Sequence, residues 1–202
     1  RVVAGHPVLY QEHVIAGGQG DLTFAHHPML HLLAGGHIGF SAKKSAITPQ
    51  NPLESAHRFA YPARTTDLSK LPAAEGGHVD LHHYPPKNDP PKHDPSETGF
   101  EDFVTLVEAD AALEADAAAF GWTAITRFAE DDIVLLIKDP RVMPITMLWY
   151  SNGGRSYAPW NGRHLGVLGI EDGCGAGAAT LAQAAGDNPI AREAVATTLP
   201  LR

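Results

Sequence analysis

Glycine and proline interrupt this chain so often that long helices are disfavoured. The 202 residues include 20 glycines and 16 prolines. Glycine frees the backbone and proline removes a hydrogen-bond donor, so both tend to end regular elements. The apolar runs between them are short and are separated by turn-forming residues, which is typical of strands. We therefore expect an all-β fold, a sandwich of antiparallel sheets with few short helices.

The distribution of apolar residues gives the order of the expected elements. Strands are predicted over 8–15, 103–107, 122–128, 133–138, 145–150 and 164–170, with a short strand over 37–40 and another apolar run over 21–33. One helix is predicted over 109–119, a loop or short helix over 175–186, and a turn capped by Asn188 over 188–193. Residues 43–72 are predicted to be a long surface excursion, and residues 84–95 a proline-rich loop.

Composition limits the classes of protein that the chain can belong to. The length favours one domain over 1–202, and 44% hydrophobic residues can form an ordinary core. A net charge of −8 opposes binding to nucleic acid or to an anionic membrane surface. A single cysteine, Cys174, excludes an internal disulfide and a cysteine-rich zinc module. We expect a cytoplasmic protein without a membrane span, and residues missing at both ends.

A first cluster of candidate functional residues contains three histidines, His26, His27 and His31. In an extended chain, alternation places His27 and His31 on one face and His26 on the other. Pro28 cannot donate to a strand ladder, so a break beside His27 is expected, which would present its imidazole to a ligand. The alternatives are three partly exposed histidines on an edge strand, or a metal site that uses His27 and His31.

A second cluster, residues 148–164, combines aromatic, arginine, asparagine and glycine residues. Aromatic faces stack on sugar rings, and arginine and asparagine donate to hydroxyl or anionic groups. The candidate binding residues are Asn152, Arg155, Trp160, Asn161 and Arg163. The alternative interpretation is a turn-rich connection with core tryptophans.

A third feature is Glu171, which follows the apolar strand predicted over 164–170. A carboxyl group at a strand end in a partly dry environment has a raised pKa, which suits a general base or acid. A solvated strand end is the alternative. Cys174 has no basic neighbour and is expected to be a buried, incidental residue. The histidines of the proline-rich region (His78, His82, His83 and His93) are expected to be solvated.

Three segments together resemble the galactose mutarotase-like superfamily, the aldose 1-epimerases and their relatives. The segment His27-Pro28-Met29-Leu30-His31-Leu32 is similar to the family's His-Pro-Tyr-Phe-Asn-Leu segment, although Met and Leu replace the aromatic pair. Pro159-Trp160-Asn161 followed by Leu168-Gly169-Ile170-Glu171 resembles the hexose-phosphate branch, where Asn-Pro-Trp precedes a Cys-Ile/Val-Glu segment. Here Asn161 follows the tryptophan, and Gly169 replaces the cysteine. The resemblance spans residues 8–172.

The resemblance implies a supersandwich of antiparallel sheets and an isomerase that interconverts the α and β anomers of an aldose without a cofactor. Glu171 would remove the anomeric proton, and His27 would protonate the ring oxygen across a space the size of one hexopyranose. A neighbouring carboxylate would help to keep the imidazole protonated. The substrate would be a small sugar or sugar derivative.

Further residues are assigned to binding on this basis. Gln11 and His13 would share one face of the strand predicted over 8–15, and we expect His13 to line the site. Arg155 and Arg163 would hold an anionic substituent, and Trp160 would stack on the sugar. The alternatives are a sugar-binding or regulatory module without turnover, and a histidine-ligated metal protein. A homodimer formed through sheet edges is compatible with the sequence.

Overall fold

The computed structural model describes residues 1–32, 34–85, 99–114 and 120–201. Antiparallel β-sheet dominates these residues, as the glycine and proline pattern predicts. Helices in the described ranges are limited to α1 (Asp110–Leu113), α2 (Leu181–Ala184) and a 3₁₀ turn over Ala191–Glu193. Neither α-helix approaches the length and apolar character that a helix needs to cross a bilayer.

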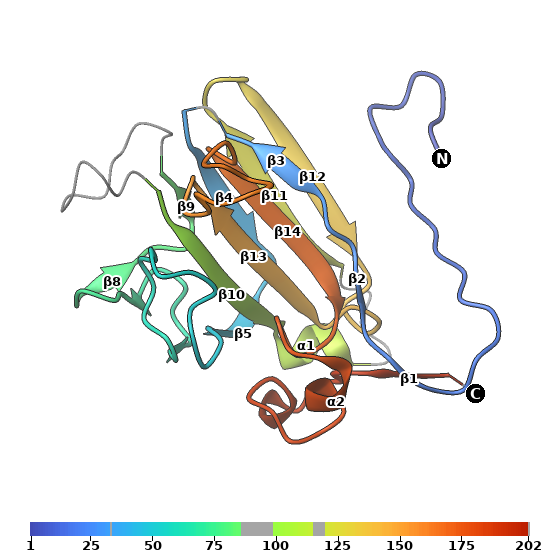
Figure 1. Ribbon diagram of the computed structural model, residues 1–202. Helices are drawn as coiled ribbons and strands as arrows, with labels where there is room; N and C mark the ends of the chain where they lie inside the picture. Colours follow the sequence, from blue (N-terminus) through green and yellow to red (C-terminus); the bar gives the residue numbers. More distant parts are fainter. Residues whose placement is uncertain (33, 86–98, 115–119, 202) are drawn as a thin grey trace.

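Two sheets form the body of the molecule (Figure 1). The seven-stranded sheet has the order β2 (Phe24–Ala25), β14 (Val167–Cys174), β13 (Ile145–Ser151), β10 (Glu101–Glu108), β5 (Lys43–Ile47) and β6 (Arg64–Thr65), and β3 (Met29–His31) also pairs with β14. The four-stranded sheet has the order β12 (Asp132–Lys138), β11 (Gly121–Arg127), β4 (Gly36–Phe40) and β9 (His83–Tyr84). Two small sheets pair β1 (Gly20–Leu22) with β15 (Leu199–Leu201), and β7 (Leu71–Pro72) with β8 (His78–Val79).

The main core contains side chains from both of the large sheets. Because side chains alternate along a strand, one face of the seven-stranded sheet contributes every second residue. These are Val104, Leu106, Leu148, Tyr150, Leu168 and Ile170, which pack in one cluster with Ile38, Ile125 and Leu136 of the four-stranded sheet. Burial of this apolar surface is the main contribution to stability.

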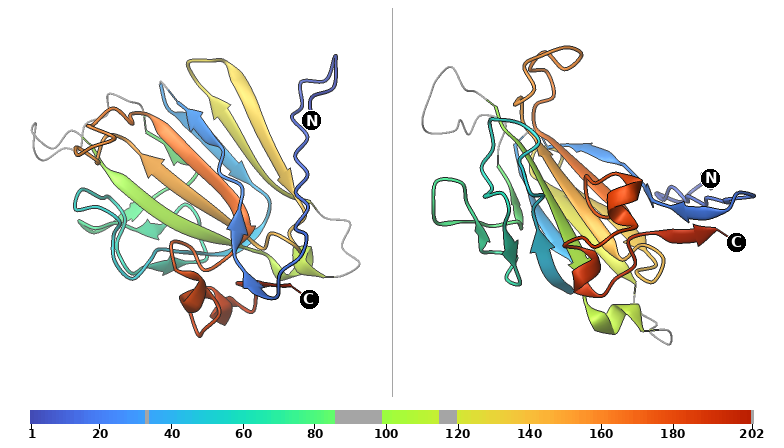
Figure 2. Two further views of the ribbon diagram at one scale, coloured as in Figure 1. Left: turned by 45° about the vertical axis from the view of Figure 1, so that its right-hand side comes forward. Right: turned by 60° about the horizontal axis from the view of Figure 1, so that its bottom comes forward.

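The opposite face of the seven-stranded sheet is covered at one end. The segment after β14 packs Ile190 against a second cluster that includes Val107, Ile145 and Met147. Figure 2 shows this C-terminal segment, with α2, beside one end of the sheet. Toward the other end of β13, Trp149 packs against the cluster and is only partly buried. The uncovered part of this face carries the candidate site.

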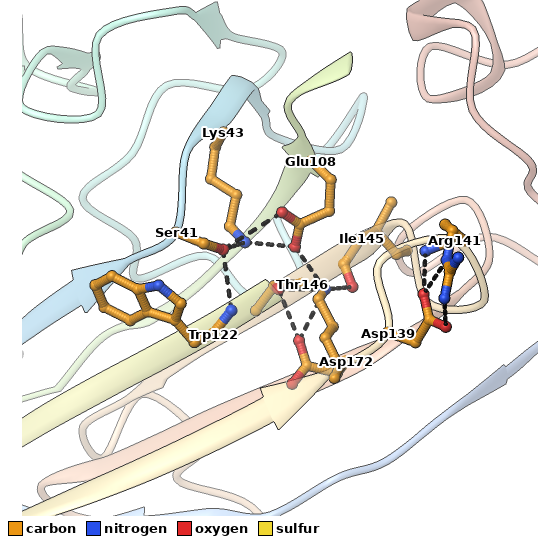
Figure 3. A network of polar contacts seen from close by, with 10 residues as sticks. Ser41, Lys43, Glu108, Trp122, Asp139, Arg141, Ile145, Thr146 and Asp172 are labelled. Carbon is orange, nitrogen blue, oxygen red and sulfur yellow. Dashed lines mark hydrogen bonds and ion pairs between the residues drawn. The ribbon is translucent and has the colours of Figure 1, made fainter. Parts of the chain in front are cut away.

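A network of buried charges lies at the edge of the main core (Figure 3). Lys43 Nζ lies 2.5 Å from Glu108 Oε1, and Lys138 Nζ lies 2.9 Å from the same oxygen. Lys138 also lies 3.0 Å from Asp172 Oδ1, which accepts a hydrogen bond from Thr146 at 2.7 Å. Two lysines and two carboxylates balance, which is how buried charges are tolerated.

The structure confirms most of the predicted strands, with ends displaced by a few residues, but corrects two predictions. Residues 8–15 lie outside the named strands and are exposed, apart from an isolated bridge between Leu9 and Val2. A strand-like composition therefore does not suffice without a partner strand. Residues 43–72 are not only surface: β5 lies inside the large sheet, and Ser45, Ala46 and Ile47 are buried.

Three smaller predictions have different outcomes. The helix predicted over 109–119 is reduced to α1, and residues 115–119 lie outside the described residues. Most of the proline-rich loop, residues 86–98 with His93, also lies outside them. Asn188 caps its turn as predicted, because its Oδ1 accepts from the backbone nitrogens of Ile190 and Ala191.

Candidate functional site

His27 and Glu171 meet on the uncovered face of the large sheet. The distance between His27 Nε2 and Glu171 Oε1 is 3.1 Å. The imidazole side chain is 47% exposed, whereas the carboxylate side chain is 12% exposed. The pair therefore joins a nearly buried carboxylate to an imidazole that solvent or a ligand can reach.

Strand pairing explains how two residues so distant in sequence come together. Both β2 and β3 pair with β14, and the strand is interrupted between them at His27 and Pro28. On either side of the break, His26 N donates to Asp172 O at 2.9 Å, and Ile170 N donates to Pro28 O at 3.0 Å. These two bonds hold the backbone of His27 beside Glu171. The break that Pro28 predicts is confirmed.

Gly169 makes room for the side chains around the pair. A Cβ atom at this position would lie 3.0 Å from Met29 Sδ, 3.3 Å from Trp149 Cβ and 3.6 Å from His27 Cε1. The first two distances are tighter than ordinary van der Waals contacts. A larger residue here would displace the neighbours of His27, which explains a glycine at this point of the strand.

Trp149 connects the pair to a second group of polar residues. Its indole lies 5.9 Å from the His27 ring in an edge-to-face arrangement. Its Nε1 donates to Glu101 Oε2 at 2.6 Å, and Ser151 Oγ donates to Glu101 Oε1 at 2.9 Å. Glu101 is completely buried, so these bonds satisfy a carboxyl group that water does not reach.

His164 completes this group. Its Nδ1 lies 2.6 Å from Ser151 Oγ. A serine hydroxyl carries one hydrogen, and Ser151 directs it to Glu101, so Nδ1 of His164 is the donor in this contact. This fixes the tautomer of a neutral His164, with its unprotonated Nε2 as the remaining acceptor.

Arg155 is stacked between two tryptophans. Its Cζ lies 4.7 Å from the centre of the Trp149 ring and 4.6 Å from that of Trp160. Its Nε donates to Glu54 Oε1 at 2.9 Å, and Tyr157 OH donates to the same oxygen at 2.6 Å. The four neighbours hold the guanidinium group in one orientation.

Burial shifts the pKa values of three groups around the pair. It raises the pKa of the Glu171 carboxyl, and the charge of His27 opposes this rise. It also raises the pKa of Glu101, against the hydrogen bonds from Ser151 and Trp149. Burial lowers the pKa of His164, and the charge of Arg155 lowers it further. Perturbed groups of this kind cluster at functional sites.

The expected gap between His27 and Glu171 is absent. The two residues share one face as expected, but they are in direct contact rather than separated by the width of a sugar. The imidazole is half exposed, so it is the member of the pair that a ligand can reach. The carboxylate, packed beside β13, provides the fixed side of the site.

Several predicted binding residues have other roles in the structure. Asn152 is buried, and its Oδ1 accepts from Gly166 N at 2.9 Å, which closes the loop between β13 and β14. Arg163 donates to the backbone oxygens of Pro159 and Trp160 at 3.0 and 3.3 Å. Asn161 occupies a left-handed position, φ 48°, in the same turn. These three residues shape the loop.

Among the described residues, His13 contacts a neighbouring histidine, and the histidines of the proline-rich region are exposed or bonded elsewhere. The His13 ring lies 4.5 Å from His26. His82 bonds to Asp80, and His78 and His83 are exposed. Cys174 is buried, as predicted. In the ranges that the structure describes, no group of three or more histidine, cysteine, aspartate or glutamate side chains is arranged to hold a metal ion.

Sequence reasoning missed Glu54, Glu101, Trp149 and His164 as parts of the site. Glu101 reaches Trp149 only in the folded sheet. Phe103, two residues further along β10, pairs with Trp149 of β13, which brings Glu101 next to the indole. The two acids Glu101 and Asp102 directly before the apolar run 103–107 are a signal that could have identified Glu101. Glu54 lies in an irregular segment, where spacing gives no signal.

Comparisons of the chain with family models, with curated proteins and with solved structures found no significant match.

Proposed function

We propose that this chain is an aldose 1-epimerase-like isomerase that interconverts the α and β anomers of a small sugar. The observation that carries the proposal is the 3.1 Å contact between His27 Nε2 and Glu171 Oε1 on the uncovered face of the sheet. The resemblance to the galactose mutarotase-like superfamily assigned the same two residues as acid and base. A supersandwich of that type is the fold that we propose together with this function.

Anomer exchange requires one base and one acid on the same hemiacetal. Glu171 accepts the proton of the anomeric hydroxyl, while His27 donates a proton to the ring oxygen, and the bond between that oxygen and C1 breaks. The open aldehyde rotates about its C1–C2 bond. On closure His27 removes the proton from the attacking hydroxyl, and Glu171 returns its proton to the new anomeric oxygen. Both residues end in their starting states, so the reaction is catalytic.

The short distance between the two residues is compatible with this reaction. The anomeric oxygen and the ring oxygen are bonded to the same carbon, so their proton donor and acceptor must also lie close together. Each partner must come within about 2.6–3.2 Å of its oxygen. A modest outward rotation of His27 away from Glu171 would provide this geometry.

The environment of Glu171 also supports a role as base. Burial raises the pKa of this carboxyl toward the operating pH, and a base is most effective when its pKa is near that pH. The charge of His27 opposes this rise in the pKa of Glu171. Asn152, Asn161 and Arg163 shape the loop beside the site, and Trp160 is proposed to stack on the substrate.

The test is anomer exchange measured by NMR exchange spectroscopy on glucose and galactose. The wild-type chain is expected to accelerate exchange above the spontaneous rate. Glu171→Gln should lower the catalysed rate by roughly 10²–10⁴-fold, because it removes the base. His31→Asn, on the same face but outside the pair, is the matched control and should retain the rate.

A sugar-binding module without turnover is the second candidate. The direct contact between His27 and Glu171 favours it, because a stable pair would compete with proton transfer to a sugar. Saturation-transfer NMR separates the two candidates. Binding of sugar without accelerated exchange would contradict the isomerase and support the module.

A further inference from the structure

We propose that Glu54 makes the site select uncharged sugars, by neutralising Arg155 and occupying its Nε donor, which weakens its attraction for phosphate and carboxylate substituents. The inference rests on the proposed function and names its substrate class. It reverses the expectation from the sequence that Arg155 holds an anionic group.

An arginine recognises phosphate or carboxylate through its planar fork of N–H donors. In this structure Glu54 Oε1 accepts a hydrogen bond from Nε of Arg155 at 2.9 Å. The rings of Trp149 and Trp160 lie on the guanidinium at 4.7 and 4.6 Å. An anion that approaches the Nε side of Arg155 would have to displace an existing carboxylate, and one that approaches the Nη groups would meet a cation that Glu54 already neutralises.

Glu54 is itself held in place. Tyr157 OH donates to Glu54 Oε1 at 2.6 Å, so the oxygen that pairs with Arg155 has a second donor. The side chains of Glu54 and Arg155 are 17% and 16% exposed, which weakens solvent screening of the pair. The carboxylate is thus a built part of the site rather than a mobile surface group.

The charges around this pair also oppose an anion. The Trp149 ring, which lies against Arg155, also packs edge-to-face with His27 and donates a hydrogen bond to the buried Glu101. Glu171 adds a further carboxylate beside His27. Three carboxyl groups, Glu54, Glu101 and Glu171, face two cations, Arg155 and the protonated His27, so the carboxyl groups outnumber the cations at this face. A sugar hydroxyl meets no such repulsion, so uncharged pyranoses are favoured.

The consequence is specific to Glu54 and predicts a gain of binding. Glu54→Gln keeps the size and an acceptor oxygen but leaves the charge of Arg155 without compensation. The variant should bind glucose 6-phosphate and inorganic phosphate about tenfold more tightly than the wild type does, because a charge-assisted bond becomes available. Affinity for glucose should change less than twofold. Glu54→Asp, which preserves the charge, should keep the wild-type preference.

The experiment titrates glucose, glucose 6-phosphate and inorganic phosphate into the full chain and follows tryptophan fluorescence, since Trp149 and Trp160 flank Arg155. Glu193→Gln is the matched control: it releases Arg64 from a carboxylate at 2.6 Å, where no tryptophan stack is present on Arg64 among the described contacts. It should gain no affinity for glucose 6-phosphate. The double variant Glu54→Gln/Arg155→Gln should lose the gain.

The outcomes separate the two proposals. Wild-type binding of glucose 6-phosphate as tight as that of glucose overturns the inference. So does a Glu54→Gln variant that is folded by circular dichroism but gains no affinity for phosphate. A wild-type chain that binds neither sugar contradicts the proposed function instead. If Glu54→Gln does not fold, Tyr157→Phe serves instead, because it removes only the hydroxyl bond to Glu54. This variant should show a smaller gain of affinity for phosphate. If it shows no gain, the inference is overturned.

Discussion

Two neighbouring residues of one strand, Glu171 and Asp172, belong to charge clusters of opposite character. Asp172 points toward the core and joins Lys138, Lys43 and Glu108 in a balanced buried network (Figure 3). Glu171 points to the other face, where its partner is a half-exposed histidine. The strand period of two places them on opposite sides of the same sheet.

One strand thus carries a carboxylate compensated inside the core and a carboxylate that belongs to the proposed site. The network has two cations for two carboxylates, and Thr146 adds a hydrogen bond to Asp172, so its groups are compensated. Glu171 is nearly as buried and burial raises its pKa, and the ion-pair partner that the described residues offer it is His27. Removing a member of the buried network should therefore lower the stability of the protein. Removing a member of the pair His27–Glu171 should lower its activity.

The largest expected effect on stability comes from Lys138→Met. This change leaves Glu108 and Asp172 buried with one lysine fewer, and breaking a buried pair costs about 3–5 kcal/mol. Urea unfolding should show this loss in the free energy of unfolding. Arg192→Met, which breaks the exposed contact with Asp187, is the control and should give no measurable change. Equal effects of the two variants would refute the assigned difference.

A smaller effect is expected from the titration of Lys43. Burial and the charge of Lys138 lower the pKa of Lys43 to about 8, against 10.5 in the unfolded chain. Between these values the unfolded state binds more protons than the folded state, so the free energy of unfolding rises with pH. The rise should be on the order of 1–3 kcal/mol between pH 8 and 10.5.

Chemical denaturation at several pH values, compared with Lys43→Met, measures this contribution. The comparison cancels the tyrosines and Cys174, whose raised pKa values act in the opposite direction. A wild-type stability that follows the variant across the whole range would show that Lys43 does not titrate there.

The smallest effect distinguishes the two neighbours on β14 directly. Asp172→Asn keeps an acceptor for Thr146 but removes the charge that faces Lys138, and we expect a loss of about 1–2 kcal/mol. Glu171→Gln should leave the free energy of unfolding within about 0.5 kcal/mol of the wild type, because it removes a carboxylate that burial disfavours. Thermal or urea unfolding of both variants provides the measurement, and the reverse order would contradict the assignment.

Much of the sheet was predictable because short apolar runs and the turn-forming residues between them are visible locally. The strands predicted over 122–128, 133–138 and 145–150 correspond to β11, β12 and β13. β5 was not predicted, because Lys43 and Lys44 give it a polar appearance. Only Glu108, far along the chain but paired with Lys43 across the sheet, explains a lysine at a buried position. The segment 8–15 shows the reverse case. Its composition predicted a strand, but its side chains are exposed and it lies outside the named strands.

The candidate site was predictable in part. The break at Pro28 and the carboxylate after an apolar strand identified His27 and Glu171. Arg155 was assigned to an anion because its cationic type was visible and its partner was not. Glu54 lies about a hundred residues away in an irregular segment, so no spacing in the sequence connects the two.

The sequence by itself determined the β-rich character, many of the turns and the candidacy of His27 and Glu171, because turn chemistry depends on neighbouring residues. Tertiary structure alone decided which charges are compensated, which pKa values are raised and which arginine is paired with a carboxylate. These properties depend on water being excluded by segments that are distant in the chain, and a sequence pattern carries no record of that exclusion.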